Sequence, residues 1–395
     1  MESKDIDFIY FMGDNGVDYP KGGITSFSRQ MMRVFGNRMA LVGISTDDTP
    51  IGRWVKKTFN EEPYFFFSVG KAKRNKMKSF IPHRFTSYLK LKKYKKEILG
   101  INVDNAFVQH SHYLLALRGW PIANKAYIFH GATNPLEKPR YSFAKWLAPI
   151  YERRMFKSLK DYNTIFVAAD DADIRKMIKR SGNRLNDKQI IKLPTRFDDT
   201  VFYPREKAES AKMLGIDSDK QIFIQVGRLS KQKGCDLIID SFNKLQKSYP
   251  ESLLFLVGDG EEKENLQNQI SRLGLNDKVK ITGFIDKEIV ALYYNAADVV
   301  LVGSHMEGWS IAMVEALACG KTIVSTKVSG TKEMIKPGVN GFIIENRDKE
   351  QFVKKMEESL KLPTINDYSI NLSKKYSLAT LKNDIEKHWK PDNAL

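Results

Sequence analysis

Short runs of β-branched and aromatic residues recur along the chain, and a longer amphipathic stretch follows each one. Because these runs are apolar on both faces and alternate with helical patterns, they predict parallel β-sheets covered by helices on both sides. We expect two doubly wound α/β units rather than one long sheet. In the first half the predicted strands are Asp7–Met12, Met39–Ile44, Pro63–Val69, Ala106–His110, Ala126–His130 and Thr164–Ala169. In the second half they are Ile222–Gly227, Leu253–Gly258, Val279–Gly283, Asp298–Val302, Thr322–Thr326 and Gly341–Ile344.

The alternation of strands and helices is interrupted at Leu193–Pro204, where two prolines and two acids lie close together. We therefore predict a first Rossmann-like domain over residues 1–200 and a second over residues 201–374. The remaining segment, 375–395, holds a helix candidate at Leu378–Trp389 that suits either unit, including packing back on the first. Ligands bind at the carboxyl ends of strands in open α/β sheets, so we expect the chemistry in a cleft between two facing units.

Length and composition agree with this picture. The chain has 395 residues, which suits two domains, and 42% of them are hydrophobic. No segment approaches the roughly eighteen apolar residues that span a bilayer. The acidic start, MESKDIDFIYFMG, runs directly into a strand, so we do not expect a secretory leader. Cys235 and Cys319 are the only cysteines, which favours a reducing cytoplasm over a disulfide framework.

The net charge of +17 belongs to the first half of the chain. Residues 1–200 hold 36 Lys and Arg against 20 Asp and Glu, whereas the remainder holds 28 against 27. Lys71–Lys96 alone has eleven basic residues and no acid. This asymmetry indicates an anionic partner for one domain only.

Two interpretations of the basic stretch at residues 71–96 remain open. One is a contact with an anionic membrane surface, on the inner face of the cell membrane. The other is an ordinary pair of helices with a solvated basic face. A third possibility, a nucleic-acid-binding protein, predicts stacking platforms or a recognition helix, and neither accompanies the charge. We therefore expect no nucleic-acid partner.

The segment Ser304–Gly320, SHMEGWSIAMVEALACG, carries the clearest chemical pattern. It follows a predicted strand and opens a helix over residues 311–318, with Ser310 as the expected N-cap and Gly320 as the terminator. Gly308 and Ser310 keep the loop slim, so backbone N–H groups can approach an anion at the positive end of the helix dipole. Two acids, Glu307 and Glu315, are placed to accept hydrogen bonds from sugar and ribose hydroxyls, although single acids in such places are also often solvated.

Other candidates follow strand ends elsewhere. Arg228 and Lys233 lie just after the strand Ile222–Gly227, where two cations suit a pyrophosphate, although loop cations are also commonly solvated. In the first half, Gly22 and Gly23 follow the first strand and allow a close approach of the backbone to a ligand. The remaining candidates are histidines at strand ends: His130, and more weakly His110 and His112.

The spacing Glu-x7-Glu from Glu307 to Glu315 resembles the signature of retaining glycosyltransferases of the GT-B fold, the glycosyltransferase group 1 family, GT4. The resemblance extends through GRLS and KG at residues 227–234, VGDG at 257–260, VKITGFI at 279–285 and PGVNGF at 337–342. It covers essentially the whole second domain. In the first domain only the glycine pair and His130 resemble the family.

The resemblance implies a GT-B architecture and a role for each matching residue. Arg228 and Lys233 would hold the diphosphate of a nucleoside diphosphate sugar, Glu315 the ribose and Glu307 a hydroxyl of the donor sugar. His130 would lie near the transferred sugar. The implied catalytic set is Glu307, His130, Arg228 and Lys233. The implied donor-binding set is Gly22, Gly23, Arg228, Lys233, Gly283, Phe284, Ile285, Glu307, Gly308, Trp309, Ser310 and Glu315, with the backbone of residues 283–285 reading the base.

The expected activity is therefore a hexosyltransferase-type transfer to an acceptor hydroxyl with retention, in cell-surface polysaccharide or glycolipid synthesis. A GT-B-fold sugar-nucleotide epimerase is the alternative enzyme. We expect no cofactor and no metal, because Arg228 and Lys233 are available for the leaving group. The Asp-x-Asp sequence at Asp171–Asp173, preceded by Asp170, is interpreted as the capped start of a helix instead of a metal site. Trp309 stands where smaller or other aromatic residues are frequent in the family, so it is expected to alter which sugar fits.

Overall fold

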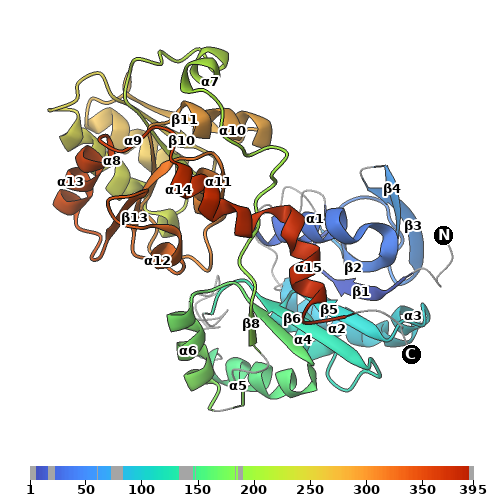
Figure 1. The fold of residues 1–395 in the computed structure, drawn as a ribbon. Helices are drawn as coiled ribbons and strands as arrows, with labels where there is room; N and C mark the ends of the chain where they lie inside the picture. Colours follow the sequence, from blue (N-terminus) through green and yellow to red (C-terminus); the bar gives the residue numbers. More distant parts are fainter. Residues whose placement is uncertain are drawn as a thin grey trace. The chain divides into compact units, whose positions relative to one another are not determined.

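The computed structural model describes residues 6–16, 23–59, 61–72, 83–132, 146, 148–182, 184–185 and 190–390 of the chain. The chain divides into two compact units (Figure 1). Unit 1 comprises Met1–Pro194 and Leu381–Leu395, and unit 2 comprises Thr195–Thr380. The division after Pro194 falls six residues before the boundary expected at 200/201, and the return to unit 1 falls six residues after the expected 374/375.

Unit 1 contains a sheet whose order among the described strands is β3-β4-β2-β1-β5-β6-β7-β8. All neighbouring strands are parallel except the edge pair β3 and β4, which is antiparallel. The strands are β1 Phe8–Phe11, β2 Met39–Ser45, β3 Trp54–Phe59, β4 Glu62–Lys71, β5 Asn105–Val108, β6 Asn124–Phe129, β7 Thr164–Val167 and β8 Ile190–Lys192. The chain reverses its direction of growth between the central strands β1 and β5, which makes this the switch point of the sheet.

Helices cover both faces of this sheet. Those of unit 1 are α1 Gly23–Phe35, α2 His83–Lys93, α3 Lys95–Leu99, α4 Ser111–Ala116, α5 Ala148–Ser158, α6 Asp171–Arg180 and α15 Leu381–Glu386. Buried side chains of α4 and α5 form one core with the sheet. On the opposite face, Phe8 of β1 packs edge-on against Phe35 of α1, with ring centroids 5.2 Å apart.

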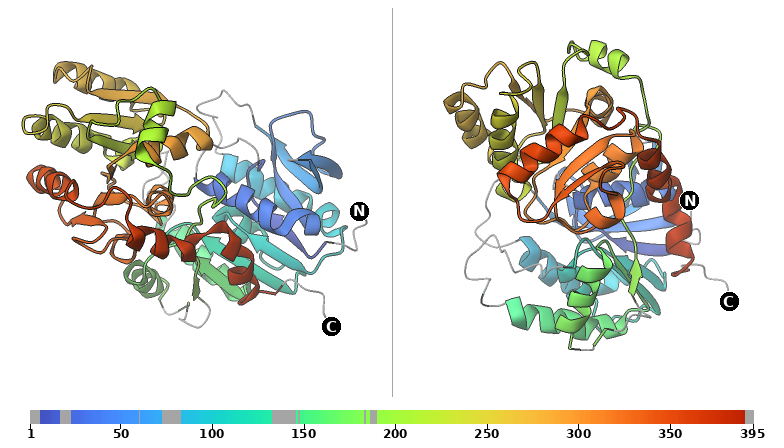
Figure 2. Two further views of the ribbon diagram at one scale, coloured as in Figure 1. Left: turned by 45° about the horizontal axis from the view of Figure 1, so that its top comes forward. Right: turned by 60° about the vertical axis from the view of Figure 1, so that its left-hand side comes forward.

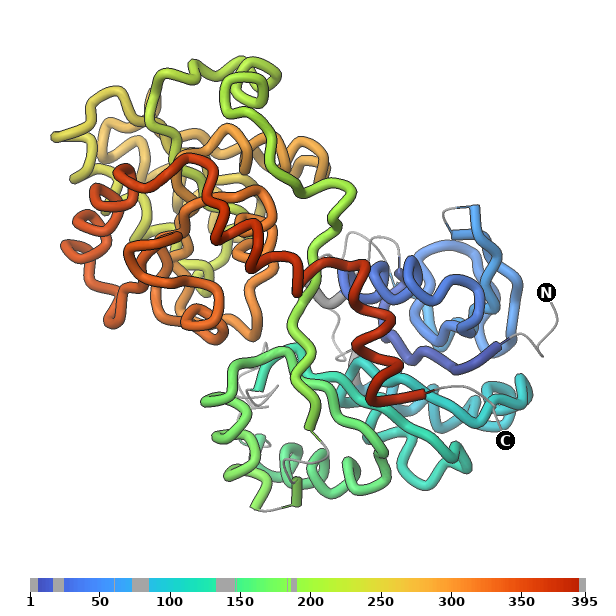
Figure 3. Tube along the Cα trace, in the orientation of Figure 1, coloured from blue at the N-terminus to red at the C-terminus, as the bar shows by residue number. Residues whose placement is uncertain are grey.

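The C-terminal segment belongs to unit 1, and its course can be followed in Figure 3. A tryptophan anchors this segment in the core of the unit. The buried ring of Trp389 packs against Phe8 and Phe107, with centroids 5.3 and 5.5 Å away. Its indole N–H donates to Oδ1 of Asn124 at 2.8 Å. Aromatic contacts of this kind stabilise by about 0.5–1.5 kcal/mol each beyond the area that they bury, so the segment is an integral part of the unit 1 core.

Unit 2 contains a fully parallel sheet whose described strands have the order β11-β10-β9-β12-β13-β14. The strands are β9 Ile222–Val226, β10 Leu253–Val257, β11 Val279–Gly283, β12 Val299–Val302, β13 Thr322–Thr326 and β14 Gly341–Ile344. Counted from β9, this is the 3-2-1-4-5-6 order of the Rossmann fold. Its switch point lies between β9 and β12, where loops after neighbouring strands diverge to opposite faces.

The helices of unit 2 also form layers on both faces of its sheet (Figure 2). They are α7 Lys207–Met213, α8 Cys235–Leu245, α9 Lys263–Arg272, α10 Lys287–Ala296, α11 Ile311–Ala318, α12 Thr331–Met334, α13 Lys349–Ser359 and α14 Asp367–Ser373. Buried residues of α8, α9 and α13 share one apolar core with the strands. In the described part of the chain, no helix is long and apolar enough to cross a membrane.

The twelve predicted strands all form, within two residues of the expected ends. Among the described residues, two further strands were not predicted. β3 carries lysines in its centre and is only partly buried, as suits an antiparallel edge strand, and β8 has three residues. The α/β fold class with two doubly wound parallel-sheet units is confirmed.

Candidate active site

Loops after three adjacent strands of unit 2 touch through their backbones at the carboxyl edge of the sheet. A Cβ atom added to Gly258, after β10, would lie 2.0 Å from the carbonyl oxygen of Gly227, after β9. A Cβ on Gly234, which precedes α8, would lie 2.1 Å from the carbonyl oxygen of Gly303, after β12. Both positions also have positive φ angles, so only glycine allows these contacts.

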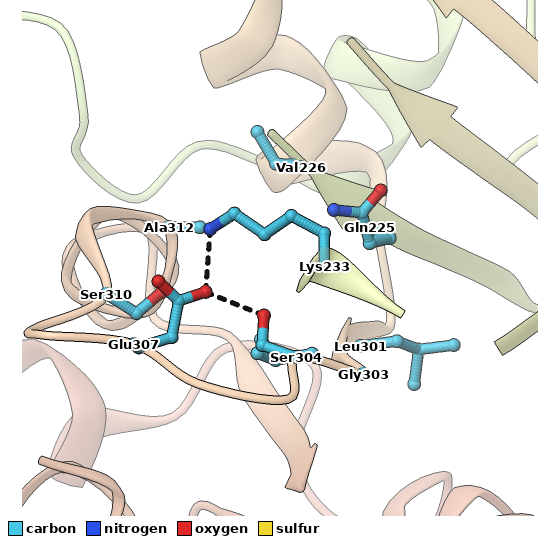
Figure 4. Close-up of a pocket in the computed structure, with 10 residues that line it drawn as sticks. Gln225, Val226, Lys233, Leu301, Gly303, Ser304, Glu307, Ser310 and Ala312 are labelled. Atoms are coloured by element: carbon cyan, nitrogen blue, oxygen red, sulfur yellow. Dashed lines mark hydrogen bonds and ion pairs between the residues drawn. The ribbon is translucent and has the colours of Figure 1, made fainter. Parts of the chain in front are cut away.

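Two charged residues of the predicted site meet at the switch point. Nζ of Lys233, from the loop after β9, lies 2.6 Å from Oε1 of Glu307, from the loop after β12. The hydroxyl of Ser304 donates to the same carboxylate oxygen at 2.6 Å (Figure 4). The two charged side chains are only 23% and 10% exposed, so neither is the solvated loop residue of the alternative interpretation.

A pocket opens beside this ion pair. Figure 4 shows its lining, in which the Lys233 side chain passes along one wall and Glu307 and Ser310 lie on the other. The lining residues come from β9, β12, the two loops that follow them and the first turn of α11: Gln225, Val226, Lys233, Leu301, Val302, Gly303, Ser304, Glu307, Ser310 and Ala312. A crevice at the switch point of a parallel sheet is the usual ligand site of such folds.

Ser310 occupies the N-cap position of α11, but its side chain does not cap the helix. The predicted N-cap position is thus confirmed, but no side-chain capping hydrogen bond forms. The hydroxyl is buried and has no hydrogen-bond partner among the described residues, and it lies in the pocket wall near Glu307. Buried polar groups are nearly always paired, so this hydroxyl and the N-terminus of α11 are suited to a bound anion.

Glu315 lies one turn further along α11 and is held by a residue that the sequence did not suggest. The hydroxyl of Tyr294, on α10, donates to Oε2 of Glu315 at 3.0 Å. Burial raises the pKa of Glu315 to about 8, although Tyr294 and Lys233 both lower it. This carboxyl is therefore mostly protonated at neutral pH in the ligand-free protein.

Arg228 does not line the pocket with Lys233. Its Nε lies 2.9 Å from Oε2 of Glu261, and the two side chains are 66% and 54% exposed. Surface pairs of this kind stabilise by only about 0–1 kcal/mol, so the guanidinium exchanges partners at little cost. Its role in diphosphate binding stays a prediction.

The segment expected to read a base lies at the same sheet edge, at the end of β11. Gly283 has a φ angle of 73°, Phe284 is exposed and Ile285 is half-buried. The amide of Gly258 donates to the hydroxyl of Thr282 at 3.2 Å, which ties the ends of β10 and β11 together. The position is open to a ligand, and base reading stays a prediction.

Trp309 points into the interior of unit 2. Its ring is 5% exposed and lies 5.8 Å from the ring of Tyr376, and a Cβ on Gly330 would lie 3.0 Å from it. The Trp309 side chain does not line the pocket. The expectation that it alters which sugar fits therefore has no support from its position. The ring instead supports the loop from beneath, next to the half-buried Gly308.

The predicted residues of unit 1 are placed at the carboxyl edge of its own sheet. Gly22 lies outside the described residues, and Gly23 is the first residue of α1. His130 directly follows β6, with its ring centroid 5.1 Å from that of Phe27. Within the described part of the chain, its buried Nε2 has no hydrogen-bond partner. Burial lowers the pKa of His130 to about 4, so the imidazole is neutral at physiological pH.

A buried polar network at the switch point of unit 1 was not foreseen. The carboxylate of Asp14, just after β1, accepts hydrogen bonds from the amide of Gly16 at 2.8 Å and the hydroxyl of Ser28 at 2.7 Å. Oγ of Ser28 also lies 3.2 Å from Oε1 of Gln109. Burial raises the pKa of Asp14 to about 7. The sequence signal was the turn residues Gly-Asp-Asn-Gly directly after the first strand.

The structure also describes the acidic run at Asp170–Asp173 and part of the basic stretch at residues 71–96. The carboxylate of Asp170 accepts from the amide of Asp173 at 2.9 Å, so the capping interpretation of the acidic run is confirmed. Within the basic stretch, residues 73–82 lie outside the described residues. Lys71 ends β4, and residues 83–96 form α2 and the start of α3. Phe85 and Leu89 of α2 are exposed.

The strand order defines unit 2 as a Rossmann-type domain, and polar groups gather at its switch point. Residues 206–376, within the second unit, match the family described as glycosyl transferases group 1. The uncharacterized glycosyltransferase MJ1607 of Methanocaldococcus jannaschii is 29% identical over 182 residues, covering 46% of each chain. A D-inositol 3-phosphate glycosyltransferase of Thermobifida fusca is 26% identical over 281 residues, covering 68% of this chain and 64% of the relative. The chain thus spans about half the length of the curated relatives it matches.

Solved structures extend the likeness over the whole chain. Sucrose-phosphate synthase from Thermosynechococcus elongatus has a TM-score of 0.77 at 17% identity, covering 96% of this chain and 97% of the other. Anabaena HepE in complex with UDP-glucose has a TM-score of 0.70 at 18% identity, covering 96% and 98%. At these identities the comparison shows the fold, and that fold is GT-B, with two parallel-sheet α/β domains.

Proposed function

We propose that the protein is a retaining, hexosyltransferase-type enzyme that moves a sugar from a nucleoside diphosphate sugar to an acceptor hydroxyl. The observation that carries this proposal is the Lys233–Glu307 pair beside the unpartnered Ser310 hydroxyl, at the start of α11 and at the switch point of unit 2. Support comes from the family match of this unit and from relatives named as glycosyltransferases. Structures of HepE with UDP and UDP-glucose add a fold-level parallel.

The diphosphate is proposed to bind between Lys233 and the N-terminus of α11. A diphosphate carries more negative charge than one carboxylate, so it competes with Glu307 for the ammonium group. Once displaced, Glu307 is free to accept a hydrogen bond from a hydroxyl of the donor sugar. One preorganised donor aimed at the charge that grows on the leaving phosphate typically contributes about 2.7–4 kcal/mol to the transition state.

No metal is required in this proposal, because Lys233, the helix N-terminus and a recruited Arg228 together offset the charge of the leaving diphosphate. The corresponding test is activity after treatment with EDTA. Turnover that is unchanged by EDTA supports the metal-free scheme, whereas loss of turnover that Mg²⁺ or Mn²⁺ restores contradicts it.

Glu315 and Tyr294 are proposed to bind the ribose. A protonated carboxyl both donates and accepts a hydrogen bond, so Glu315 can pair with two neighbouring hydroxyls while Tyr294 fixes its orientation. The backbone of residues 283–285 is proposed to read the base, and His130 is proposed to act on the transferred sugar as a neutral imidazole. Retention places the acceptor oxygen on the face that the diphosphate leaves, with Glu307 as a positioning group and not as a nucleophile.

The first experiment is isothermal titration of the full chain with UDP, GDP and ADP, followed by their sugars. One nucleoside diphosphate should bind at micromolar affinity and bind more weakly to Lys233→Met. The second is proton NMR of the transfer product, which reports the anomeric configuration. Failure of all three nucleotides to bind contradicts the proposal, and an inverted product contradicts retention. A sugar of changed configuration, formed when no acceptor is present, would indicate an epimerase instead.

The acceptor is proposed to be a carbohydrate or a lipid-linked saccharide in cell-surface polysaccharide or glycolipid synthesis, reached at the inner face of the membrane. Phe85 and Leu89 are four residues apart on α2, so their exposed side chains share one helix face. This apolar pair lies within the basic stretch 71–96, a combination typical of interfacial helices. Sedimentation with phosphatidylglycerol vesicles at low and moderate salt tests the contact, and no binding at either salt contradicts it.

A further inference from the structure

Arg347 lies outside the pocket but touches both loops that build it. It sits between β14 and α13 and is half-buried. Its Nη1 donates to the backbone carbonyl of Gly303, the residue before Ser304. Ser304 in turn donates to the Glu307 carboxylate. The guanidinium of Arg347 therefore stabilises the backbone of the loop that carries Glu307.

The same guanidinium packs against the other loop. A Cβ built on Gly234 would lie 2.7 and 2.8 Å from the two terminal nitrogens of Arg347, and 2.1 Å from the carbonyl oxygen of Gly303. Gly234 directly follows Lys233 and is the N-cap of α8. Arg347 thus fills the space beside the point where the two loops meet. Asp236, in the first turn of α8, adds electrostatic attraction to the guanidinium.

The backbone of Arg347 is in the left-handed region, with a φ angle of 52°. This conformation is unfavourable for a residue with a long side chain, and glycine adopts it freely. Contacts of the arginine side chain must therefore offset this backbone strain. The contacts with Gly303 and Gly234 are what the side chain makes here.

We propose that Arg347 is a positioning residue for the donor site, which clamps the loops after β9 and β12 so that Lys233 and Glu307 remain at pairing distance. The inference rests on the proposed function, because it assigns Arg347 to the phosphate-binding side of that site. It acts through Lys233 and touches no substrate itself. A misplacement of the loops of about 1 Å is enough to cost a site much of its affinity or rate.

The test compares variants of the full chain in titrations with the nucleoside diphosphate that binds best among UDP, GDP and ADP. Arg347→Gly removes the clamp and also relieves the backbone strain, so it is expected to fold. We expect its Kd to rise about tenfold. Arg347→Lys retains one donor for Gly303 and should recover part of the loss. The matched control is Lys244→Gln. This change breaks an exposed ion pair between Lys244 of α8 and Glu350 of α13, and neither residue lies in the two loops.

A double variant distinguishes positioning from general weakening. In the Lys233→Met background, Arg347→Gly should add less than a twofold loss, because the clamp acts through Lys233. Full additivity of the two losses, or a Kd for Arg347→Gly within twofold of the parent, overturns the inference. These outcomes leave the proposed function intact so long as Lys233→Met itself weakens binding.

If Lys233→Met binds like the parent, the phosphate site and with it the proposed function are wrong. The clamp is then judged by hydrogen exchange, which needs no nucleotide. Amides of residues 232–235 and 303–307 should exchange several-fold faster in Arg347→Gly than in Lys244→Gln. Equal exchange in the two variants overturns the clamp.

Discussion

Lys233 and Glu307 are 74 residues apart in the sequence, yet their charged atoms lie 2.6 Å apart at the switch point of unit 2. The two residues approach because β9 and β12 are neighbours in the sheet and the glycines at 234 and 303 let the following loops touch. In the ligand-free protein the ion pair occupies the place proposed for the diphosphate. Substrate binding then amounts to an exchange of partners at one ammonium group.

This exchange predicts opposite effects of Glu307→Gln on nucleotide binding and on transfer. The neutral amide no longer competes for Lys233, so the nucleoside diphosphate should bind as tightly as in the parent or more tightly. The transfer rate should fall about tenfold to a hundredfold, because a charge-assisted hydrogen bond to the sugar is lost. Calorimetry with the nucleoside diphosphate and kcat from initial rates measure the two effects. Near-parental turnover with only a raised KM for the donor would show that Glu307 does not act in the transition state.

A second prediction concerns Lys233 alone. Lys233→Met removes the ammonium that meets the diphosphate, and the Kd for the nucleoside diphosphate should rise about tenfold to a hundredfold. The matched control is Lys231→Met, in the same short helical turn, whose side chain is exposed and does not line the pocket. The two variants have equal net charge, so similar losses in both would indicate long-range attraction instead of a contact.

Much of this arrangement could be predicted from the sequence, because it depends on where strands end. Lys233 and Glu307 follow strand ends, and in a parallel sheet such residues gather at one edge. The fold followed from the alternation of apolar runs and amphipathic stretches. The edge strand β3 escaped notice because its two central lysines break the apolar pattern.

The rest depended on side-chain directions that spacing does not encode. Ser310 has the sequence position of a capping residue, but its hydroxyl lies in the pocket wall instead. Tyr294 reaches Glu315 from α10, a helix that precedes β12 and carries no motif. The Asp14 network joins β1, α1 and the end of β5, three segments far apart in sequence.

Gly234 offers a prediction about stability. Gly234→Ala places a Cβ 2.1 Å from the carbonyl oxygen of Gly303 at a φ angle of 59°, so both strain and a backbone clash oppose folding. We expect a loss of about 2–4 kcal/mol in the free energy of unfolding. Gly215→Ala is the control, with a φ angle of 66° and no atom within 4 Å of the added Cβ. It should lose only about 1 kcal/mol. Urea denaturation measures both, and equal losses would show that the loop contact is unimportant.

The raised pKa of Glu315 predicts how stability depends on pH. The carboxyl has an ordinary pKa of 4.5 when exposed and about 8 in the folded protein. Between these values the folded state holds a proton that the unfolded state has released. Stability from this group is therefore present at low pH and is lost as pH rises from about 4.5 through 8.

Glu315→Gln isolates this contribution. The amide cannot titrate, yet its oxygen still accepts the hydrogen bond from Tyr294, so the fold is preserved. The free energy of unfolding of the parent minus that of the variant should decrease steadily when urea denaturation is repeated at pH 5, 6.5 and 8. Other groups that titrate in this range, such as Asp14 with its pKa of about 7, are common to both proteins and cancel in the difference. A difference that is flat, or that increases with pH, would mean that Glu315 is already ionised in the folded protein. The ribose would then meet a carboxylate that only accepts hydrogen bonds, and Glu315→Gln would weaken nucleotide binding at every pH instead of mainly above pH 8.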